Sequence, residues 1–456
     1  MTQRERLLNG MIAAANRDGY AGANVSAVIG EAKVSRPTFY DYFEDRDACF
    51  VAAIGDVHER LLGEVRDAVE RGAPERALAS AIAATLAFAG TEPAGARFLM
   101  KEALAGGPKA LDARDRGIAQ TAKIVEDAFR RARRGSEIPD VPVAAVLGGI
   151  HRVLASRLRR GERAVGQLEA DLLEWVDSYG RGAAERRWRK LKPLPAPERS
   201  PYLPPVNLSP PPVLGPGRPR LSEEEVLENH RQRIMFATAS VVQERGYTAA
   251  TVADITRLAG VDGRAFYRLF ADKEDAFSAI HELGFQYLMA AAAGAFFAGK
   301  SWPERIWEAF RATTQSVDGN PTLAHVAFVE AYAIGARGIQ RVEDSHVAFT
   351  IFLQEGYRYR AERDGAAGES APSRLALEAI VVTIFEIVYL RTRASARPKT
   401  AGLLAHIVHL CLAPFVGAAA SDELIDREIA GTRPASRSAR ARSPRGRAGG
   451  AGALPR

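Results

Sequence analysis

Apolar residues along this chain recur at intervals of three and four, and no long stretch alternates apolar and polar residues. That spacing puts apolar side chains on one face of a helix. It predicts helices over residues 3–17 and 234–242, which precede Gly-Tyr pairs at Gly19 and Gly246. Glycine ends helices because it accepts positive φ angles that other residues resist. The pattern predicts an all-α protein.

One short pattern occurs twice, 227 residues apart. Between Gly19 and Phe50, eleven of 32 positions are identical to their counterparts in the second copy. Most shared residues are apolar and lie at helical spacing, so the repeat is a small folded unit rather than low-complexity sequence. The shared positions include Val25/Val252, Ala32/Ala259, Val34/Val261, Phe39/Phe266, Tyr40/Tyr267, Phe43/Phe270 and Phe50/Phe277.

Each copy predicts two short helices joined by a tight turn. Asn24 and Thr251 can cap the first helix, and Thr251 with Asp254 matches a capping box. Ser35 and Asp262 stand where the second helix needs its cap, so the capping chemistry persists although the residue differs. With the shared phenylalanines turned inward, this arrangement is a helix-turn-helix.

The turn and the helix after it differ between the copies in small ways. The turn holds Gly260 in one copy and Lys33 in the other, and a positive φ there would cost the lysine about 1 kcal/mol. A further helix, capped by Asp45 or Asp272, carries Arg46 or Lys273 in its first turn. Because the helix dipole favours acids at that end, a cation there predicts a nearby anion.

The second helix of each copy exposes polar and basic side chains. Its N-terminus, with Arg36 and Thr38 in the first copy, is the end that enters a major groove in such motifs. Arginine reads guanine through two hydrogen bonds, and tyrosine hydroxyls suit phosphates. The candidate DNA-contacting residues are Ser35, Arg36, Pro37, Thr38, Tyr40, Tyr42 and Arg46 in the first copy, and Gly263, Arg264, Ala265, Tyr267, Arg268 and Lys273 in the second.

At these residues the sequence resembles the TetR/AcrR family of bacterial transcriptional regulators. VSRPTFYDYFEDRDACF, residues 34–50, and VDGRAFYRLFADKEDAF, residues 261–277, carry the resemblance, which covers about 45 residues in each copy. It implies a three-helix DNA-binding head on a larger helical body. It also implies that the body dimerises through its last two helices and holds an effector pocket.

Composition divides the chain into two tandem units. Residues 193–220 contain eleven prolines among 28 residues, which predicts a semi-rigid linker. Its last residues, GRPR, resemble the family's N-terminal arm, so Arg218 and Arg220 are candidate minor-groove contacts; the alternative is that they only end the linker. The predicted parts are the first head (1–50), its body (51–192), the linker (193–220), the second head (221–278), its body (279–430) and a disordered Arg-rich tail (431–456).

Two apolar-faced helices close each body, at residues 143–158, 167–179, 376–390 and 403–415. The third is apolar almost all round, which predicts burial on two sides in a four-helix interface. Five aromatic residues of the second body are candidates for an effector pocket, with plain core packing as the alternative: Trp307, Phe310, Phe328, Tyr332 and Phe352.

Successive major grooves lie about 34–36 Å apart, and two identical chains usually supply the two heads that span them. Here one chain can supply both heads. The sequence therefore predicts an intramolecular pseudo-dimer, with a homodimer of whole chains as the alternative. Base-facing residues can then differ between the heads because the two half-sites can differ. Aromatic and phosphate-contacting residues persist because the DNA backbone is the same at both.

Charge and cysteine content narrow the function. The net charge is +7, and seven arginines follow the last acidic residue, Glu428, so the rest balances at 62 − 7 = 55 basic against 55 acidic residues. The high pI therefore does not indicate a basic platform, and DNA binding rests on the motifs. Two distant cysteines fit a reducing compartment, and no secretory signal begins the chain. We expect a protein of the bacterial cytoplasm and nucleoid, with no membrane partner.

The sequence predicts a regulator that binds double-stranded DNA, a repressor released by a small-molecule effector, with no cofactor. His406 and His409 lie at i, i+3, but a metal site is disfavoured because no carboxylate or thiolate accompanies them. One alternative is a helical scaffold whose heads no longer bind DNA. An enzyme is disfavoured because the sequence has no phosphate loop, nucleophile elbow or His-Glu-x-x-His motif.

Overall fold

The computed structural model describes residues 1–133, 138, 141–162, 164–180, 209–214, 221–364 and 371–432, which form helices and no strand. The prediction of an all-α fold is confirmed. The first unit comprises α1 (Gln3–Gly22), α2 (Val25–Ala32), α3 (Arg36–Tyr42), α4 (Arg46–Arg71), η1 (Pro74–Arg76), α5 (Ala77–Thr91), α6 (Pro93–Lys101), η2 (Glu102–Leu104), α7 (Gly107–Arg131), α8 (Val143–Arg159), η3 (Val165–Leu168) and α9 (Glu169–Asp177).

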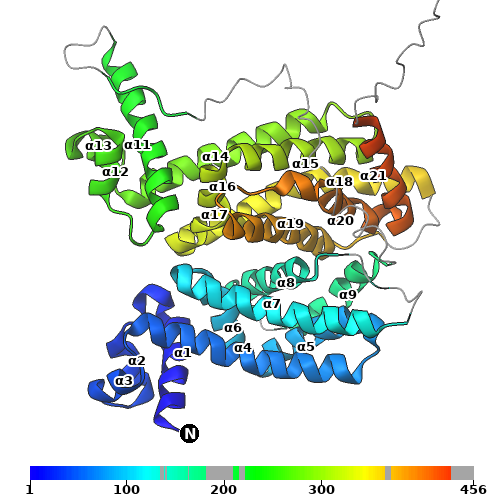
Figure 1. The fold of residues 1–456 in the computed structure, drawn as a ribbon, viewed down its shortest axis with the longest axis horizontal. Helices are drawn as coiled ribbons and strands as arrows, with labels where there is room; N and C mark the ends of the chain where they lie inside the picture. The colour runs from blue at the N-terminus through cyan, green and yellow to red at the C-terminus, as the bar shows by residue number, and fades with distance from the viewer. Residues whose placement is uncertain are drawn as a thin grey trace, which may run out of the picture.

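The second unit repeats this order with changes towards its end. It comprises α11 (Glu223–Arg245), α12 (Val252–Ala259), α13 (Gly263–Leu269), α14 (Lys273–Phe296), α15 (Trp302–Gly319), α16 (Pro321–Phe328), η4 (Glu330–Ile334), α17 (Ala336–Phe349), α18 (Ile351–Asp364), α19 (Arg374–Ala394), η6 (Thr400–Leu403), α20 (Leu404–Val416) and α21 (Ala418–Thr432). The two units lie one above the other, with both heads at the same end of the molecule (Figure 1).

The glycines that were expected to end the first helices do have positive φ angles. Gly19, with φ 73°, kinks α1 near its end, and Gly246, with φ 78°, ends α11. The predicted closing helices correspond to α8, α9, α19 and α20, and α21 follows them. The expected head–body boundaries fall inside α4 and α14, so one continuous helix joins each head to its body.

The repeat continues into the bodies, where it contains one clear difference. Gly107 and Gly335 both have positive φ, 76° and 83°, and stand at the starts of α7 and α17. From there α7 runs unbroken to Arg131, whereas its counterpart is interrupted at Thr350 and continues as α18. The second body is therefore the more irregular of the two.

The units meet where α8 packs along α19, and one hydrophobic core contains residues of both bodies. Two glycines allow this close approach. A Cβ atom at Gly148 would come within 2.5 Å of Glu386 Oε1, and one at Gly149 within 2.5 Å of Thr383 Oγ1. Beside this contact, α9 is tied to α20, because the Tyr179 hydroxyl donates to the Leu410 carbonyl over 2.9 Å.

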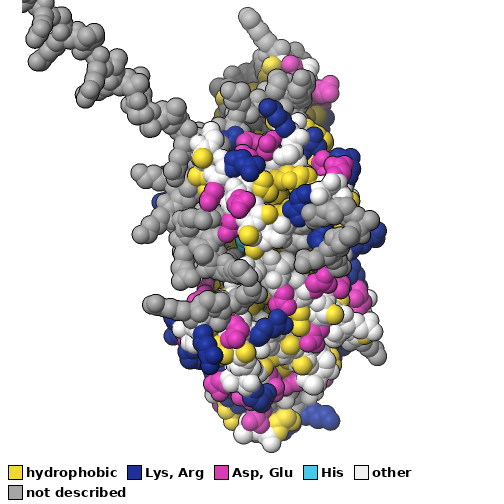
Figure 2. All heavy atoms as spheres, turned by 90° about the vertical axis from the view of Figure 1, so that its right-hand side faces the viewer, with side chains coloured by type: hydrophobic (Ala, Val, Ile, Leu, Met, Phe, Trp, Pro, Cys, Tyr) yellow, Lys and Arg dark blue, Asp and Glu magenta, His cyan; other side chains and the backbone are white. Residues whose placement is uncertain are grey.

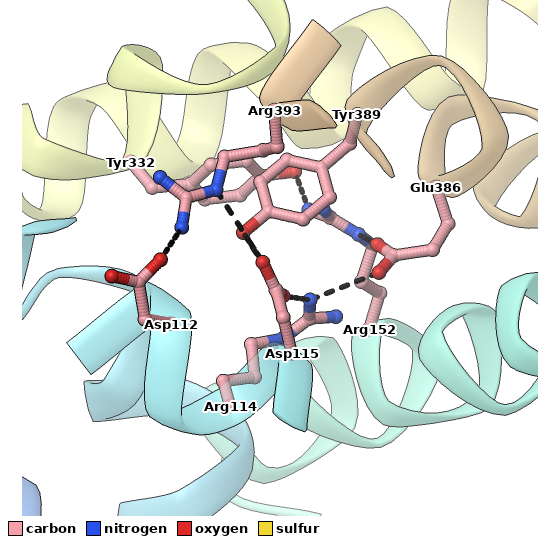
Figure 3. Close-up of polar contacts among 8 residues, drawn as sticks. All are labelled: Asp112, Arg114, Asp115, Arg152, Tyr332, Glu386, Tyr389 and Arg393. Carbon is pink, nitrogen blue, oxygen red and sulfur yellow. Dashed lines mark hydrogen bonds and ion pairs between the residues drawn. The ribbon is translucent and has the colours of Figure 1, made fainter. Parts of the chain in front are cut away.

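A buried group of charged side chains crosses the same contact (Figure 3). The fully buried Glu386 carboxylate pairs with Arg114, over 2.9 Å, and with Arg152, both on the first unit. Burial by itself raises the pKa of Glu386, but the two guanidinium groups outweigh it and hold the pKa well below its usual range. Arg152 also donates to the Tyr332 hydroxyl, so four elements of two units, α7, α8, η4 and α19, share one network.

A second branch of the network lies closer to the surface. Tyr389 donates to the Asp115 carboxylate over 3.1 Å, and Arg393 pairs with Asp112 and Asp115. All these bonds join α7 to α19. The relative position of the units, and hence of the heads, therefore depends on specific polar contacts as well as on apolar packing.

In the described part of the chain, no single helix is long and apolar enough to cross a membrane. One pair, Pro74–Thr91 with Pro93–Leu104, reaches the required length and composition only when its members are added, and they are bent by 117°. The end of the molecule turned away from the heads carries acidic and basic side chains interspersed (Figure 2).

Candidate nucleic-acid interface

The helices of each head begin at the caps that the sequence predicted. Asn24 accepts a hydrogen bond from the Ala27 amide, and Ser35 and Asp262 accept from the amides three residues on, over 3.3 and 2.7 Å. The capping box at Thr251 is only half formed. The Thr251 hydroxyl accepts from the Asp254 amide but donates to the Asp254 carboxylate, so that carboxylate does not reach back to the cap's own amide.

Shared aromatic residues separate an inner face of the second helix from an outer one. Phe39 and Phe266 are fully buried, and Phe43 and Phe270 nearly so. Tyr40 and Tyr267, one residue after the first pair, are 52% and 62% exposed. The buried phenylalanines therefore fix which side of α3 and of α13 faces solvent.

The turn before α3 and α13 is left-handed in both heads, which is the conformation that strains a lysine at this position. Lys33 has φ 52° and Gly260 φ 60°, and Lys33 is the only non-glycine residue with positive φ in the described part of the chain. An arginine of the first helix closes each turn. Arg6 donates to the Ala32 carbonyl over 2.9 Å, and Arg233, its counterpart at +227, donates to the Ala259 carbonyl.

Sequence reasoning missed these arginines. The likeness between the two copies extends before Gly19, since the same offset of 227 relates Arg4 to Arg231 and Arg6 to Arg233. Arg4 and Arg231 lie over the rings of Phe43 and Phe270, 5.9 and 5.2 Å from the ring centroids. Extending the alignment to the chain start would have found both pairs.

The outer face of α3 is exposed and polar. Ser35 and Thr38 share a hydrogen bond of 2.8 Å between their hydroxyls, and Arg36 donates to the Ser26 hydroxyl over 3.2 Å. Pro37 occupies the first turn, where its missing amide proton has no cost. Tyr42, 44% exposed, completes this face.

The outer face of α13 is smaller and more basic. Gly263 is exposed and Ala265 half-buried, which leaves Arg264 projecting from the first turn. Arg264 has no ion-pair partner among the described residues, whereas Arg268 pairs with Glu223 at the start of α11. The two heads therefore present arginine at neighbouring but different positions.

Arg46 and Lys273 lie deeper than the other candidates. Each cation lies 4.3 Å from the ring centroid of the tyrosine in the Gly-Tyr pair, Tyr20 or Tyr247. Arg46 pairs with Asp47 over 2.7 Å, and Lys273 donates to the Tyr247 and Ala250 carbonyls. The anion expected beside the first cation is thus a neighbouring side chain, and the second has carbonyl oxygens in its place.

Both heads are joined to their bodies by the same buried contact, which sequence reasoning did not find. The Tyr20 amide donates to Glu102 over 3.2 Å, and the Tyr247 amide donates to Glu330 over 2.8 Å. Both glutamates begin short 3-10 turns, η2 and η4, and are 4% and 7% exposed. The only sequence signal is a shared Glu-Ala pair at an offset of 228.

The other candidate residues lie apart from the heads or outside the described residues. Arg218 and Arg220 lie outside the described residues. Of the five candidate effector residues, only Tyr332 lines a large cavity. Trp307, Phe310, Phe328 and Phe352 pack in the core, where Phe328 also lines a small cavity.

The histidine pair requires a correction. His409 does have a carboxylate neighbour, since its Nδ1 lies 3.3 Å from Asp422 Oδ1 and 3.1 Å from Ser421 Oγ. Within the described ranges, no three His, Cys, Asp or Glu side chains are placed to hold a metal ion.

The comparisons with known proteins point to one family. The family described as "Bacterial regulatory proteins, tetR family" matches residues 8–53 and 234–280, which contain the helix-turn-helix of each head. No curated protein matches the chain.

Two solved structures are similar at low identity. The transcriptional regulator FadR from Bacillus subtilis, in complex with stearoyl-CoA, is 13% identical, with a TM-score of 0.34 over 38% of this chain and 97% of that one. A TetR-family transcriptional regulator from Syntrophomonas wolfei is 17% identical, with a TM-score of 0.30 over 45% of this chain and 93% of that one.

Proposed function

The chain belongs to the TetR family of bacterial regulatory proteins, with two family units in tandem, and on this premise we propose that its two heads together read one asymmetric DNA site. The proposal rests on one observation: the two heads are built alike inside, but the exposed faces of α3 and α13 carry different residues. Buried phenylalanines and caps orient α3 and α13 alike, while Arg36 and Arg264 project from different positions. Arginines so placed suit guanine recognition in two unlike half-sites.

We further propose that the DNA-reading unit is one chain, folded as a pseudo-dimer. The surface of α8, with its glycines and Arg152, complements α19, with Glu386 and Thr383. This complementarity supports pairing of a first unit with a second unit. The linker then makes the partner in the same chain available at a high effective concentration. The two heads lie at the same end of the molecule, which supports their contacting one face of a duplex (Figure 1).

The proposed activity is repression that a small-molecule effector relieves. Support comes from the family and from the large cavity between the bodies, which is described below. A second class of function, a scaffold with inactive heads, has no observation in its favour, because the exposed faces of both heads keep arginine and tyrosine.

Selection of bound fragments from random DNA tests the proposal with purified full-length protein. We expect two different half-sites, about 10–10.5 base pairs apart between centres or a multiple of that spacing. Affinity should fall steeply with salt, because each phosphate contact releases counterions. Selection of no motif at all would favour the scaffold.

Light scattering on dilute protein tests the pseudo-dimer independently. A mass near 49.3 kDa, with one asymmetric footprint, is expected. A stable mass near twice that value, on a palindromic footprint, would show that two whole chains form the reading unit.

A further inference from the structure

A cavity of about 1070 Å³ lies between the two units, at the break in the second body. Helix α8 of the first unit contributes Ala155 and Ser156, and most of the remaining wall comes from α17, α18 and α19. Thr350, where the helix is interrupted, is part of that wall. The volume is at the upper end of the range for small-molecule sites.

Two polar groups in the wall lack hydrogen-bond partners. Ser156 Oγ and His346 Nε2 are both unsatisfied, although their residues are only 5% and 7% exposed. Burial, assisted by Arg152, lowers the pKa of His346 to about 3, so its ring is neutral at neutral pH. Unpaired polar groups at such depth are rare in native proteins, and a ligand that bonds to them would satisfy both.

The rest of the wall is mainly apolar, and a charged side chain in it that lacks an ion-pair partner among the described residues is an arginine. The acidic side chains at the cavity are engaged, Glu343 with Arg159 and Glu378 with Arg157. Arg374, in the first turn of α19, is exposed and has no ion-pair partner among the described residues. An apolar molecule that carries a carboxylate would fit these features better than a cation.

The cavity also touches the two turns that hold the heads. Leu104 and Tyr332, which are counterparts at an offset of 228, both line it. Two residues before them, in the same short turns, Glu102 and Glu330 accept the hydrogen bonds from the heads. Both turns contribute side chains to one apolar cluster. One molecule in this cavity therefore contacts the supports of both heads.

We propose that the cavity between the units binds one apolar carboxylic acid per chain, and that η2 and η4 transmit its binding to the two heads. The proposed binding site does not depend on the proposed DNA-binding function, whereas the proposed transmission to the heads does. The site lies between the units, so it differs from a pocket within each body in its stoichiometry. One ligand per chain is expected here, and two would be expected from a pocket in each unit.

Titration calorimetry on the full chain without DNA tests the site. The probes are 2-naphthoate and, with the same apolar body and a positive group, 2-naphthylmethylammonium. We expect one 2-naphthoate per chain, bound at least about tenfold more tightly than the cation because it can pair with arginine. Two equivalents per chain, a preference for the cation, or no binding of 2-naphthoate would overturn the site.

Substitutions locate the site. Ala155→Phe fills the cavity and should weaken binding more than about tenfold. Ser156→Ala removes only the hydroxyl and should weaken it about fivefold. Ala144→Phe, at a half-buried position of the same helix outside the cavity, should leave it unchanged. Unchanged binding in both Ala155→Phe and Ser156→Ala would overturn the proposal, and Ser156→Ala decides if the larger residue prevents folding.

Half-site footprints with and without 2-naphthoate test the transmission. Glu330→Met removes the acceptor for the Tyr247 amide, whereas Glu330→Gln keeps one. With the natural chain, we expect the ligand to lower protection of both DNA half-sites. With Glu330→Gln it should still lower protection of the second half-site, and with Glu330→Met it should not. Equal responses of the two variants would overturn transmission through η4. A chain that binds one 2-naphthoate but no DNA would disprove the proposed function and leave the site standing.

Discussion

The two heads share the arrangement of caps, buried phenylalanines and turns that forms their fold, and they differ most in what they expose. Their caps, buried phenylalanines, left-handed turns and glutamate supports have counterparts, while Arg36, Pro37 and Thr38 of one become Gly263, Arg264 and Ala265 of the other. These internal contacts are alike because both heads must hold the same fold. Under the proposed function, the outer residues are free to differ because each head meets its own stretch of DNA.

The bodies, unlike the heads, differ where they are buried. The two faces that pack against each other are unlike and complementary. The first unit offers glycines and two buried arginines, and the second offers Glu386 and Thr383. Two second units paired together would lack the glycine surface and the arginines that neutralise Glu386. The interface therefore specifies a pair of unlike units, which a homodimer of single units cannot form.

The largest effect that we predict comes from breaking this complementarity. Glu386→Gln leaves Arg152 buried without a counter-charge and Arg114 with Asp115 alone, which should lower the free energy of unfolding by about 3–5 kcal/mol. Denaturant unfolding measures it, with Glu378→Gln as the matched control. Glu378 forms a more exposed ion pair across the same contact, at 24% side-chain exposure, and should cost about 1 kcal/mol or less. Equal losses would mean that the buried network does not specify the pair.

Removing the arginines that we propose to read bases tests the difference between the heads. Arg36→Ala should relax base preference at one half-site and Arg264→Ala at the other, by about 1–3 kcal/mol for each lost base contact. Fragment selection with each variant measures it. Arg268→Ala is the comparison: Arg268 is also a candidate DNA contact, but it pairs with Glu223, so its loss should alter the motif less. An unaltered motif for either main variant would show that its head does not read bases through that arginine.

The heads could be predicted because the interactions that form them are local. Each cap accepts a bond from the amide three residues on, and the phenylalanines lie one helical turn apart. The contacts between parts could not be predicted in this way. Tyr20 meets Glu102 across 82 residues, and Arg114 meets Glu386 across 272. A lone acidic residue in a helical pattern usually indicates a solvated position, so nothing local distinguished Glu102 or Glu386.

The effector candidates illustrate the same limit. An aromatic side chain in a helical pattern fits a core and a pocket equally well, and four of the five candidates pack in the core. The cavity depends instead on the break at Thr350 and on residues of both units, including Ser156 and His346. Only the packing of one unit on the other reveals it.

The turn before the recognition helix allows a smaller test of the likeness between heads. Gly260→Ala should destabilise the second head by about 1–2 kcal/mol, from the left-handed backbone and from displacement of Arg233. A Cβ atom there would come within 2.5 Å of the Arg233 Nη2 atom that closes the turn. Thermal unfolding measures the loss. Gly263→Ala, in open space on α13, is the control and should be neutral or stabilising.

Phosphate contacts should be equivalent in the two heads. Tyr40→Phe and Tyr267→Phe each remove one exposed hydroxyl, so each should weaken binding to all DNA sequences by about 1 kcal/mol. Equilibrium titrations against the selected site and against unrelated DNA measure it. A changed sequence preference without loss of affinity would contradict phosphate contact and make the tyrosines base readers.

The smallest effect concerns Lys33, the residue that departs from glycine at the turn. Lys33→Gly relieves a left-handed strain of about 1 kcal/mol, but glycine loses about 0.5–1 kcal/mol more conformational freedom on folding. The net gain in stability should be a few tenths of a kcal/mol, far less than the loss from Gly260→Ala. The asymmetry arises because Arg6 already closes the first turn with the lysine in place, by donating to the Ala32 and Lys33 carbonyls. Thermal unfolding of the two variants measures it, and a gain as large as the Gly260→Ala loss would mean that strain alone distinguishes the turns.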